Sequence, residues 1–186
     1  NRPGHAKEHP RKTPVSQRPP KQVEEIVPEG AEWRFRTGEF GRAGAWSQSA
    51  YDTTGWRVGK VGLGYDYKAD TRTELSDMKG TYTQVQLRTT FDLEKGFDAK
   101  SLGLSISYDD GFVCYINGKP AFASHVFFNN GKADVRHHES KTEEYFSFAQ
   151  SAGLLKEGSN TIGIHGFNVQ ANSSDFLMNP RVVRDL

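Results

Sequence analysis

Two adjacent carboxylates, Asp109 and Asp110, are the strongest candidates for chemistry in this sequence. They follow the alternating stretch at residues 102–108 and precede Gly111. Carboxylates are hard oxygen donors of the kind that Ca²⁺ collects, with about 6–8 oxygens around each ion. We therefore expect the pair to help bind a calcium ion. The alternative is that both side chains accept backbone N–H groups and shape the turn into the next strand.

A second oxygen-rich cluster lies near the C-terminus, where Asp175 follows Asn172, Ser173 and Ser174. Asp175 is the third candidate metal ligand. Its alternative role is to cap the loop before the last strand.

Aromatic side chains in predicted loops are candidates for binding sugar, because sugar rings stack on aromatic faces while loop amides bind hydroxyls. The candidates are Tyr67 in GYDYKADTRTE and Phe127, Phe128, Asn129 and Asn130 in VFFNNGK. Two consecutive Phe side chains cannot both point inward from a strand, so one is expected to be a binding platform or subunit contact, or to be buried under the next loop. Trp56 and Tyr65 are expected to pack in the core.

Other catalytic and metal-binding patterns have little support. His125, His137, His138 and His165 form no zinc-binding spacing, although Glu139 lies beside the central pair. Cys114 alternates with Phe112 and Ile116, which is typical of a small buried residue in a strand. The sequence has no nucleophile elbow and no phosphate loop, and nothing singles out a pair of glycosidase carboxylates. These observations argue against an enzyme.

The elements that must position these residues are β-strands. Val85, Leu87, Thr89, Phe91 and Leu93 fall on one face of a strand, and Gln84, Gln86 and Arg88 fall on the other. Asn117 and Gly118 lie between two apolar runs, which is a strong hairpin signal. Further strands are expected at residues 121–128, 144–149, 160–169 and 175–183, with a short helical turn at 150–156. Seven or eight strands separated by Gly and Asn turns predict an all-β sandwich of the jelly-roll type.

The N-terminal residues differ in composition from the rest of the chain. Residues 1–28 hold six of the eight prolines, and residues 1–22 hold six basic residues against one acid. Such a segment cannot build a core of its own and needs its own domain or a neighbouring subunit to become ordered. We therefore divide the chain into a basic, extended tail at residues 1–28 and a jelly-roll domain at residues 29–186.

Several landmarks together resemble a known family. They are YDTTGW followed by WRVGKVGLGY up to Tyr65, then DDGFVCYINGK from Asp109, LLKEGSNTIGIHGFN from Leu154, and SSDF from Ser173. Over roughly residues 31–186, the chain resembles the galactose-binding-like jelly-roll modules attached to secreted bacterial hydrolases, phosphatases and sulfatases. The resemblance implies a non-catalytic module that binds a polysaccharide or other glycan and carries a structural calcium ion. It adds weight to Asp109 and Asp110, since sugar-binding adhesin domains of yeast use a neighbouring Asp pair for calcium and sugar together.

The predicted function has an alternative from another class. The chain could be a structural subunit of an extracellular or cell-envelope assembly, tethered to neighbours or to copies of itself by residues 1–28. Both readings place the protein outside the cytoplasm, in the periplasm, the envelope or the extracellular space, and the start at Asn1 is compatible with export. The acidic domain without a recognition motif argues against nucleic acid as a partner, and no apolar run is long enough to span a membrane.

Overall fold

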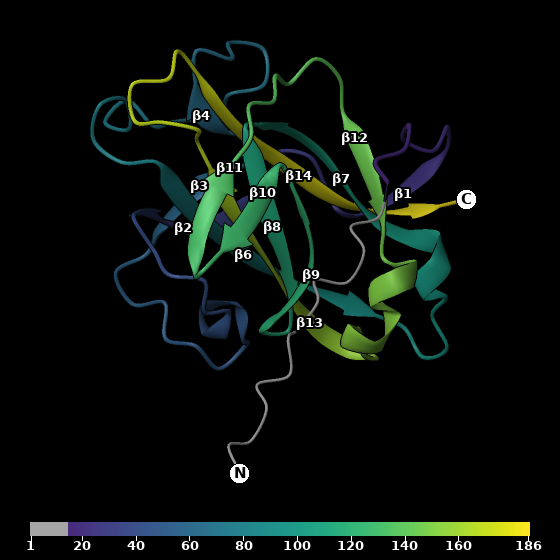
Figure 1. The fold of residues 1–186 in the computed structure, drawn as a ribbon. Helices are drawn as coiled ribbons and strands as arrows, with labels where there is room; N and C mark the ends of the chain where they lie inside the picture. The colour runs from purple at the N-terminus through teal and green to yellow at the C-terminus, as the bar shows by residue number, and fades with distance from the viewer. Residues whose placement is uncertain (1–14) are drawn as a thin grey trace.

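The computed structural model describes residues 15–186, which form an all-β sandwich of two sheets (Figure 1). One sheet has the strand order β12-β7-β14-β4-β5, with β1 also paired to β14, and the other has the order β3-β2-β6-β13-β8-β9. Every strand pairing is antiparallel except β4 with β5. The predicted all-β sandwich class is confirmed.

The strands of the first sheet are β1 (Val23–Val27), β4 (Leu63–Tyr65), β5 (Thr73–Glu74), β7 (Leu102–Asp109), β12 (Glu144–Ser147) and β14 (Phe176–Asp185). Those of the second sheet are β2 (Glu32–Gly38), β3 (Arg57–Lys60), β6 (Gln84–Leu93), β8 (Gly111–Ile116), β9 (Lys119–Ser124) and β13 (Gly158–Phe167). A separate hairpin consists of β10 (Val126–Asn129) and β11 (Lys132–Val135). Residues 15–186 also contain three short 3₁₀ helices: η1 (Ala45–Ser47), η2 (Ala99–Ser101) and η3 (Ala149–Leu154), the last over part of the expected helical turn.

The main core lies between the two sheets and follows the period of two. On β7, Leu102, Leu104, Ile106 and Tyr108 are all fully buried. Val85, Leu87, Phe91 and Leu93 of β6 enter the same core. The alternation predicted from the sequence therefore identifies the inner faces correctly, because successive side chains of a strand point to opposite faces.

The β8–β9 hairpin turns at Asn117 and Gly118, as expected. Both residues have positive φ, at +50° and +86°, which the tight turn between twisted strands requires. The Asn117 side chain also accepts from the Thr161 amide at 2.8 Å and donates to the Leu154 carbonyl at 2.9 Å. The turn residue thus fixes the hairpin to β13 and to η3.

The outer face of the second sheet is covered by a second, smaller core. Its buried members are Trp46, Val113, Tyr115, Val126 and Phe167. Trp56 packs against this cluster and stacks on Trp46, while Tyr65 is buried in the main core. As a result, the polar residues Gln86, Arg88 and His165 are buried as well.

Part of the expected tail belongs to the sandwich. Residues 23–27 form β1, which pairs with the C-terminal end of β14 (Figure 1). Further upstream, Gln17 exchanges two backbone hydrogen bonds of 2.9 Å with Tyr145 on the edge strand β12. The physical reason is the free edge of each strand, which offers unpaired N–H and C=O groups to any extended segment. Residues 1–14 of the expected tail lie outside the described residues.

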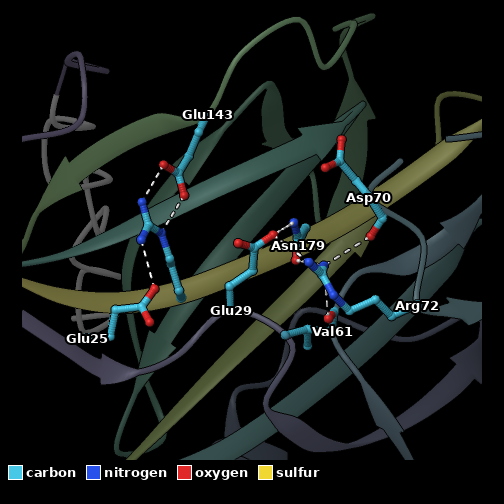
Figure 2. A network of polar contacts seen from close by, with 8 residues as sticks. Glu25, Glu29, Val61, Asp70, Arg72, Glu143 and Asn179 are labelled. Atoms are coloured by element: carbon cyan, nitrogen blue, oxygen red, sulfur yellow. Dashed lines mark hydrogen bonds and ion pairs between the residues drawn. The ribbon is translucent and has the colours of Figure 1, made fainter. Parts of the chain in front are cut away.

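Arginines of β14 and the neighbouring loop fasten this region (Figure 2). Arg181 donates to both oxygens of Glu143, at 2.6 and 2.7 Å, and to Glu25 of β1 at 2.8 Å. Arg72 donates to Glu29 at 2.7 Å, and this hydrogen bond lowers the pKa of Glu29. The bidentate Arg181–Glu143 pair is directional and holds the residue before β12 against β14. Single hydrogen bonds from Arg181 to Glu25 and from Arg72 to Glu29 hold β1 and the residues that follow it.

Within residues 15–186 there is no helix with the length and apolar character needed to cross a bilayer.

Candidate functional site

Three acidic side chains meet at one end of the sandwich. Asp109 ends β7, Asp175 lies in the loop before β14, and Glu139 lies between β11 and β12. The register of β7 and β14 explains the first contact, because Leu177 pairs with Asp109 and Asp175 lies two residues upstream. Carboxylate oxygens of all three residues lie within 4.8 Å of one another.

Asp109 is the buried member of this acidic cluster, with 0% of its surface exposed. The Tyr67 hydroxyl donates to its Oδ2 at 2.7 Å, while its Oδ1 is buried without a hydrogen-bond partner among the described residues. Burial is the main cause that raises the pKa of Asp109 to about 8, and the carboxylates of Asp110, Asp175 and Glu139 raise it further, against the hydrogen bond from Tyr67. A buried carboxylate oxygen of this kind needs a proton or a cation.

The donor set of the acidic cluster fits a hard divalent cation. Oxygens bound to one Ca²⁺ lie about 2.3–2.6 Å from the ion, so separations of up to about 5 Å between ligands are natural. Asp109, Glu139 and Asp175 would supply three of the oxygens, with Glu139 exposed to solvent. The unpartnered Oδ1 of Asp109 is the observation that favours a cation over a purely structural cluster.

Asp110 is placed differently from its neighbour. Its carboxylate accepts the His138 amide at 3.0 Å and the Val169 amide at 2.7 Å, and its Oδ1 lies 3.1 Å from Nδ1 of His137. Both oxygens are therefore in use, and Asp110 is not a member of the acidic cluster. This is the alternative role considered from the sequence, in which the carboxylate shapes the chain by accepting backbone N–H groups.

The contribution of Glu139 was missed by the sequence reasoning, which related it only to the adjacent histidines. Its position depends on a contact with a residue distant in the sequence, since the Tyr67 hydroxyl lies 3.2 Å from Glu139 Oε2. The nearby His137 also contacts it, with Nε2 at 3.3 Å from Glu139 Oε1. No periodicity in the sequence reports such contacts. The only sequence signal for Glu139 is its place beside His137 and His138, which were themselves considered as metal ligands.

The histidines form no metal group in the part of the chain that the structure describes. His137 faces Asp110 and Glu139, whereas His138 contacts Glu144 at 2.8 Å and stacks on Tyr108. His125 lies beside His138, with ring centroids 4.5 Å apart. These contacts hold the 136–144 segment on the end of the sandwich.

A groove lies next to the acidic cluster, between the loop after β2 and the β10–β11 hairpin. Its volume is about 490 Å³. The lining side chains are charged, polar and aromatic: Glu39, Phe40, Arg42, Thr83, Gln84, Phe128, Lys132, Asp134, Phe167 and Asn168 are among them. The acidic cluster residues do not line it.

The five residues predicted to bind ligand do not converge on one site. Phe128 lines the groove, whereas Tyr67 lies at the acidic cluster. Phe127 is 57% exposed and carries the Arg136 guanidinium 5.6 Å from its ring centre, so one Phe of the pair does point outward. Asn129 and Asn130 are exposed at the hairpin turn, where Asn130 has φ of +49°. Neither asparagine lines the groove.

Cys114 is buried in β8, and burial raises the pKa of its thiol. It therefore lacks the thiolate character and the access that a nucleophile needs.

Comparison with solved structures identifies a fold but no family. No protein-family model matches the chain, and no curated protein sequence matches it. The similar structures include Bacteroides uniformis β-glucuronidase, with a TM-score of 0.57 and 18% identity over 88% of this chain and 18% of that one. A glycosyl hydrolase family 2 member from Bacteroides cellulosilyticus gives a TM-score of 0.54 and 12% identity over 86% of this chain and 20% of that one.

The chain shares its fold with one part of these glycosidases. It spans about a fifth of their length, so their activity as whole enzymes is not transferred by the match. A calcium-binding mutant of Bacteroides uniformis β-glucuronidase 2 is similar to the same extent, with a TM-score of 0.56 and 19% identity over 87% of this chain and 18% of that one. At this level of identity the likeness establishes a β-sandwich domain of the kind found in glycosidases.

Proposed function

We propose that this chain is a non-catalytic carbohydrate-binding module with a galactose-binding-like jelly roll, acting outside the cytoplasm. The observation that carries the proposal is the open groove, whose aromatic and polar lining is the composition that sugar sites use. The shared fold with part of several glycosidases supports a role beside carbohydrate.

The acidic cluster is not arranged for catalysis. A carboxylic acid of raised pKa beside other carboxylates resembles a glycosidase pair, whose carboxyl groups lie roughly 5 Å apart in retaining enzymes. Asp109, however, is fully buried beneath the Tyr67 hydroxyl. A glycosidic oxygen must come within hydrogen-bond distance of the general acid, and no sugar can reach Asp109 in this arrangement.

We assign the acidic cluster to a structural calcium ion instead. Calcium there would join the end of β7 to the 139 loop and the 175 loop, and it would satisfy Oδ1 of Asp109. Its chemistry is the neutralisation of three neighbouring carboxylates, which stabilises the loops at this end of the sandwich.

The test is retention of the purified full chain on immobilised polysaccharides, together with a search for hydrolysis of aryl glycosides. We expect retention on at least one polysaccharide and no hydrolysis. Hydrolysis that disappears in Glu139→Gln would contradict the non-catalytic assignment, and failure to bind any glycan would contradict the binding assignment.

The structural-subunit alternative is weakened by one observation, the packing of Gln17 and residues 23–27 along the sandwich. Because these residues pair with β12 and β14 of their own chain, they need no neighbouring subunit. The alternative therefore depends on residues 1–14. Light scattering of the full chain and of a variant lacking residues 1–14 tests it: oligomers present only in the full chain would favour the subunit role.

A further inference from the structure

In the groove beside the acidic cluster, the basic side chains have free hydrogen-bond donors, whereas the carboxylates already accept hydrogen bonds from the protein. One wall is the loop after β2, with Glu39 and Arg42, and the other is the β10–β11 hairpin, with Lys132 and Asp134. The end of β13 also contributes to the lining, at Phe167. The lining carries two acidic and two basic side chains, so its formal charge is zero. What the groove can bind therefore depends on which of these four side chains are already paired within the protein.

The two acids of the groove are already engaged by the protein. Glu39 accepts from the Thr83 amide at 2.7 Å, from the Thr83 hydroxyl at 2.9 Å and from Nε2 of Gln84 at 3.0 Å. Asp134 accepts from Arg136 at 3.1 Å. Glu39 in particular holds the start of β6 against the loop after β2, so its carboxylate stabilises the wall of the groove and is not free to bind a ligand.

The two cations have no such partners. Within residues 15–186, neither Arg42 nor Lys132 forms an ion pair or donates a side-chain hydrogen bond. The Arg42 guanidinium lies 4.8 Å from the centre of the Phe128 ring, and the Arg42 carbonyl accepts from the Tyr115 hydroxyl at 3.0 Å. The aromatic face and the anchored backbone hold the guanidinium at the groove while its N–H groups stay available.

Three of the uncharged residues that line the groove are aromatic: Phe40, Phe128 and Phe167. Phe128 packs edge-on against Phe167, with ring centroids 6.3 Å apart, and Phe40 lines the opposite wall. Ring C–H groups of a sugar can pack on such surfaces, while a negatively charged substituent would face the free guanidinium and ammonium groups.

The groove is separate from the acidic cluster, but two of its lining residues are hydrogen-bonded to Asp175 of the cluster and to its neighbour Asp110. Asp110, next to the cluster residue Asp109, accepts the Val169 amide, and Nδ2 of Asn168 donates to the Asp175 carbonyl at 3.2 Å. Asn168 and Val169 both line the groove. A ligand there would not touch a cation at the cluster.

We propose that this groove binds a saccharide unit carrying a carboxylate or a sulfate, with the anionic group placed against Arg42 and Lys132. The inference rests on the proposed carbohydrate-binding function and adds the site and the ligand class. The free donors of Arg42 and Lys132 select a negatively charged, acceptor-rich sugar over a neutral one, since both oxygens of Glu39 already accept hydrogen bonds and Asp134 already accepts from Arg136.

The test is isothermal titration of the full chain with three matched probes at fixed calcium and low salt. The probes are oligomers of glucuronic acid, oligomers of glucose of equal length, and sulfated glucose oligomers. We expect either or both anionic probes to bind at least about tenfold more tightly than the neutral one, and binding to weaken as salt rises. The carboxylate and sulfate arms then identify which group the groove prefers.

Variants locate the site. Arg42→Gln/Lys132→Gln should weaken anionic binding by about tenfold or more. The control Lys95→Gln/Lys156→Gln removes the same charge from two exposed lysines that do not line the groove, and it should leave affinity unchanged. Melting temperatures of both variants check that the fold is intact.

Each contrary result has a separate meaning. Equal binding of neutral and anionic probes, or loss of affinity in the control as large as in the groove variant, overturns the inference and leaves the proposed module in place. Failure of the chain to bind any of the probes also overturns it. Failure on every immobilised polysaccharide would remove the proposed function as well.

Discussion

Asp109 and Asp110 are neighbours in the chain, yet their carboxylates have opposite hydrogen-bonding states. Asp110 accepts two backbone amides, whereas Asp109 has one oxygen without a partner among the described residues. Burial raises the cost of an unpaired charge, so the difference decides which residue is the metal candidate.

At the residue scale, we expect Asp109→Asn to remove the calcium response without unfolding the protein. Asparagine keeps the shape and an acceptor for the Tyr67 hydroxyl, and it removes the charge that a cation needs. Calcium titration followed by thermal unfolding measures the effect. Asp77→Asn is the matched control, because Asp77 also accepts from a tyrosine hydroxyl, that of Tyr82 at 2.9 Å, outside the cluster. A calcium response that survives in Asp109→Asn would place the cation elsewhere.

The buried, neutral His165 predicts that the protein loses stability at acidic pH. Burial is the main cause that lowers the pKa of His165 to about 3, with the nearby Arg36 charge as a second cause. The ring is held neutral between Gln84, at 2.8 Å from Nε2, and Gln86, at 3.5 Å from Nδ1. Because the unfolded chain takes up this proton near pH 6.5 and the folded chain does not, stability is lost as the pH falls from about 6.5 toward 3, by about 1.4 kcal/mol per pH unit well below the upper value.

Urea unfolding between pH 7 and pH 4.5 measures this loss, and His165→Gln should flatten the slope by the His165 share. An NMR titration provides the direct readout, since the His165 imidazole should remain neutral when exposed histidines are protonated. Protonation of His165 near pH 6.5 in the folded protein would contradict the assignment.

At the scale of elements, β1 is part of the sandwich and not a dispensable tail. It pairs with residues 182–185 of β14, buries Val27 and supplies Glu25 to Arg181. We therefore expect deletion of residues 1–27 to give a lower melting temperature than deletion of residues 1–14, which leaves β1 in place. Differential scanning calorimetry of the two truncated chains decides the matter. Equal stability of both would show that β1 contributes nothing to the fold.

The β10–β11 hairpin carries Phe127 and Phe128 on opposite faces of β10. Phe128 points to the groove and packs on Phe167, while Phe127 on the opposite face of the strand is exposed. The hairpin closes with Asn130 and Gly131 at φ of +49° and +79°, a turn that fixes this alternation. Only one of the two phenylalanines can therefore serve the groove.

At the scale of the whole molecule, calcium should act as a ligand of the native state. A cation that binds only the folded protein stabilises it by about 2.7 kcal/mol when its concentration is 100 times its Kd. For a chain of this size that corresponds to a rise of roughly 5–10 °C in the melting temperature. Differential scanning calorimetry with calcium, with magnesium and with a chelator measures it. Identical melting temperatures in calcium and chelator would argue against the metal.

The sequence by itself determined the buried faces of β6 and β7 and the turn of the β8–β9 hairpin, but not β1, which it placed in the tail. Alternation over β6 and β7 and the Asn117–Gly118 turn are local properties, because side-chain direction and turn geometry depend on residues near one another. The same local logic placed Cys114 in a strand interior. It left open whether one phenylalanine of the pair is exposed or buried under the next loop, and the structure shows Phe127 exposed.

Only the tertiary structure decided how the candidate residues are grouped. Asp109 meets Asp175 through the register of β7 with β14, Glu139 joins them from a loop, and Tyr67 serves this cluster and not the groove. The groove itself combines residues from the loop after β2, the start of β6, the hairpin and the end of β13. Such meetings depend on which strands become neighbours, and strand pairing across distant parts of the chain leaves no mark on the local pattern of residues.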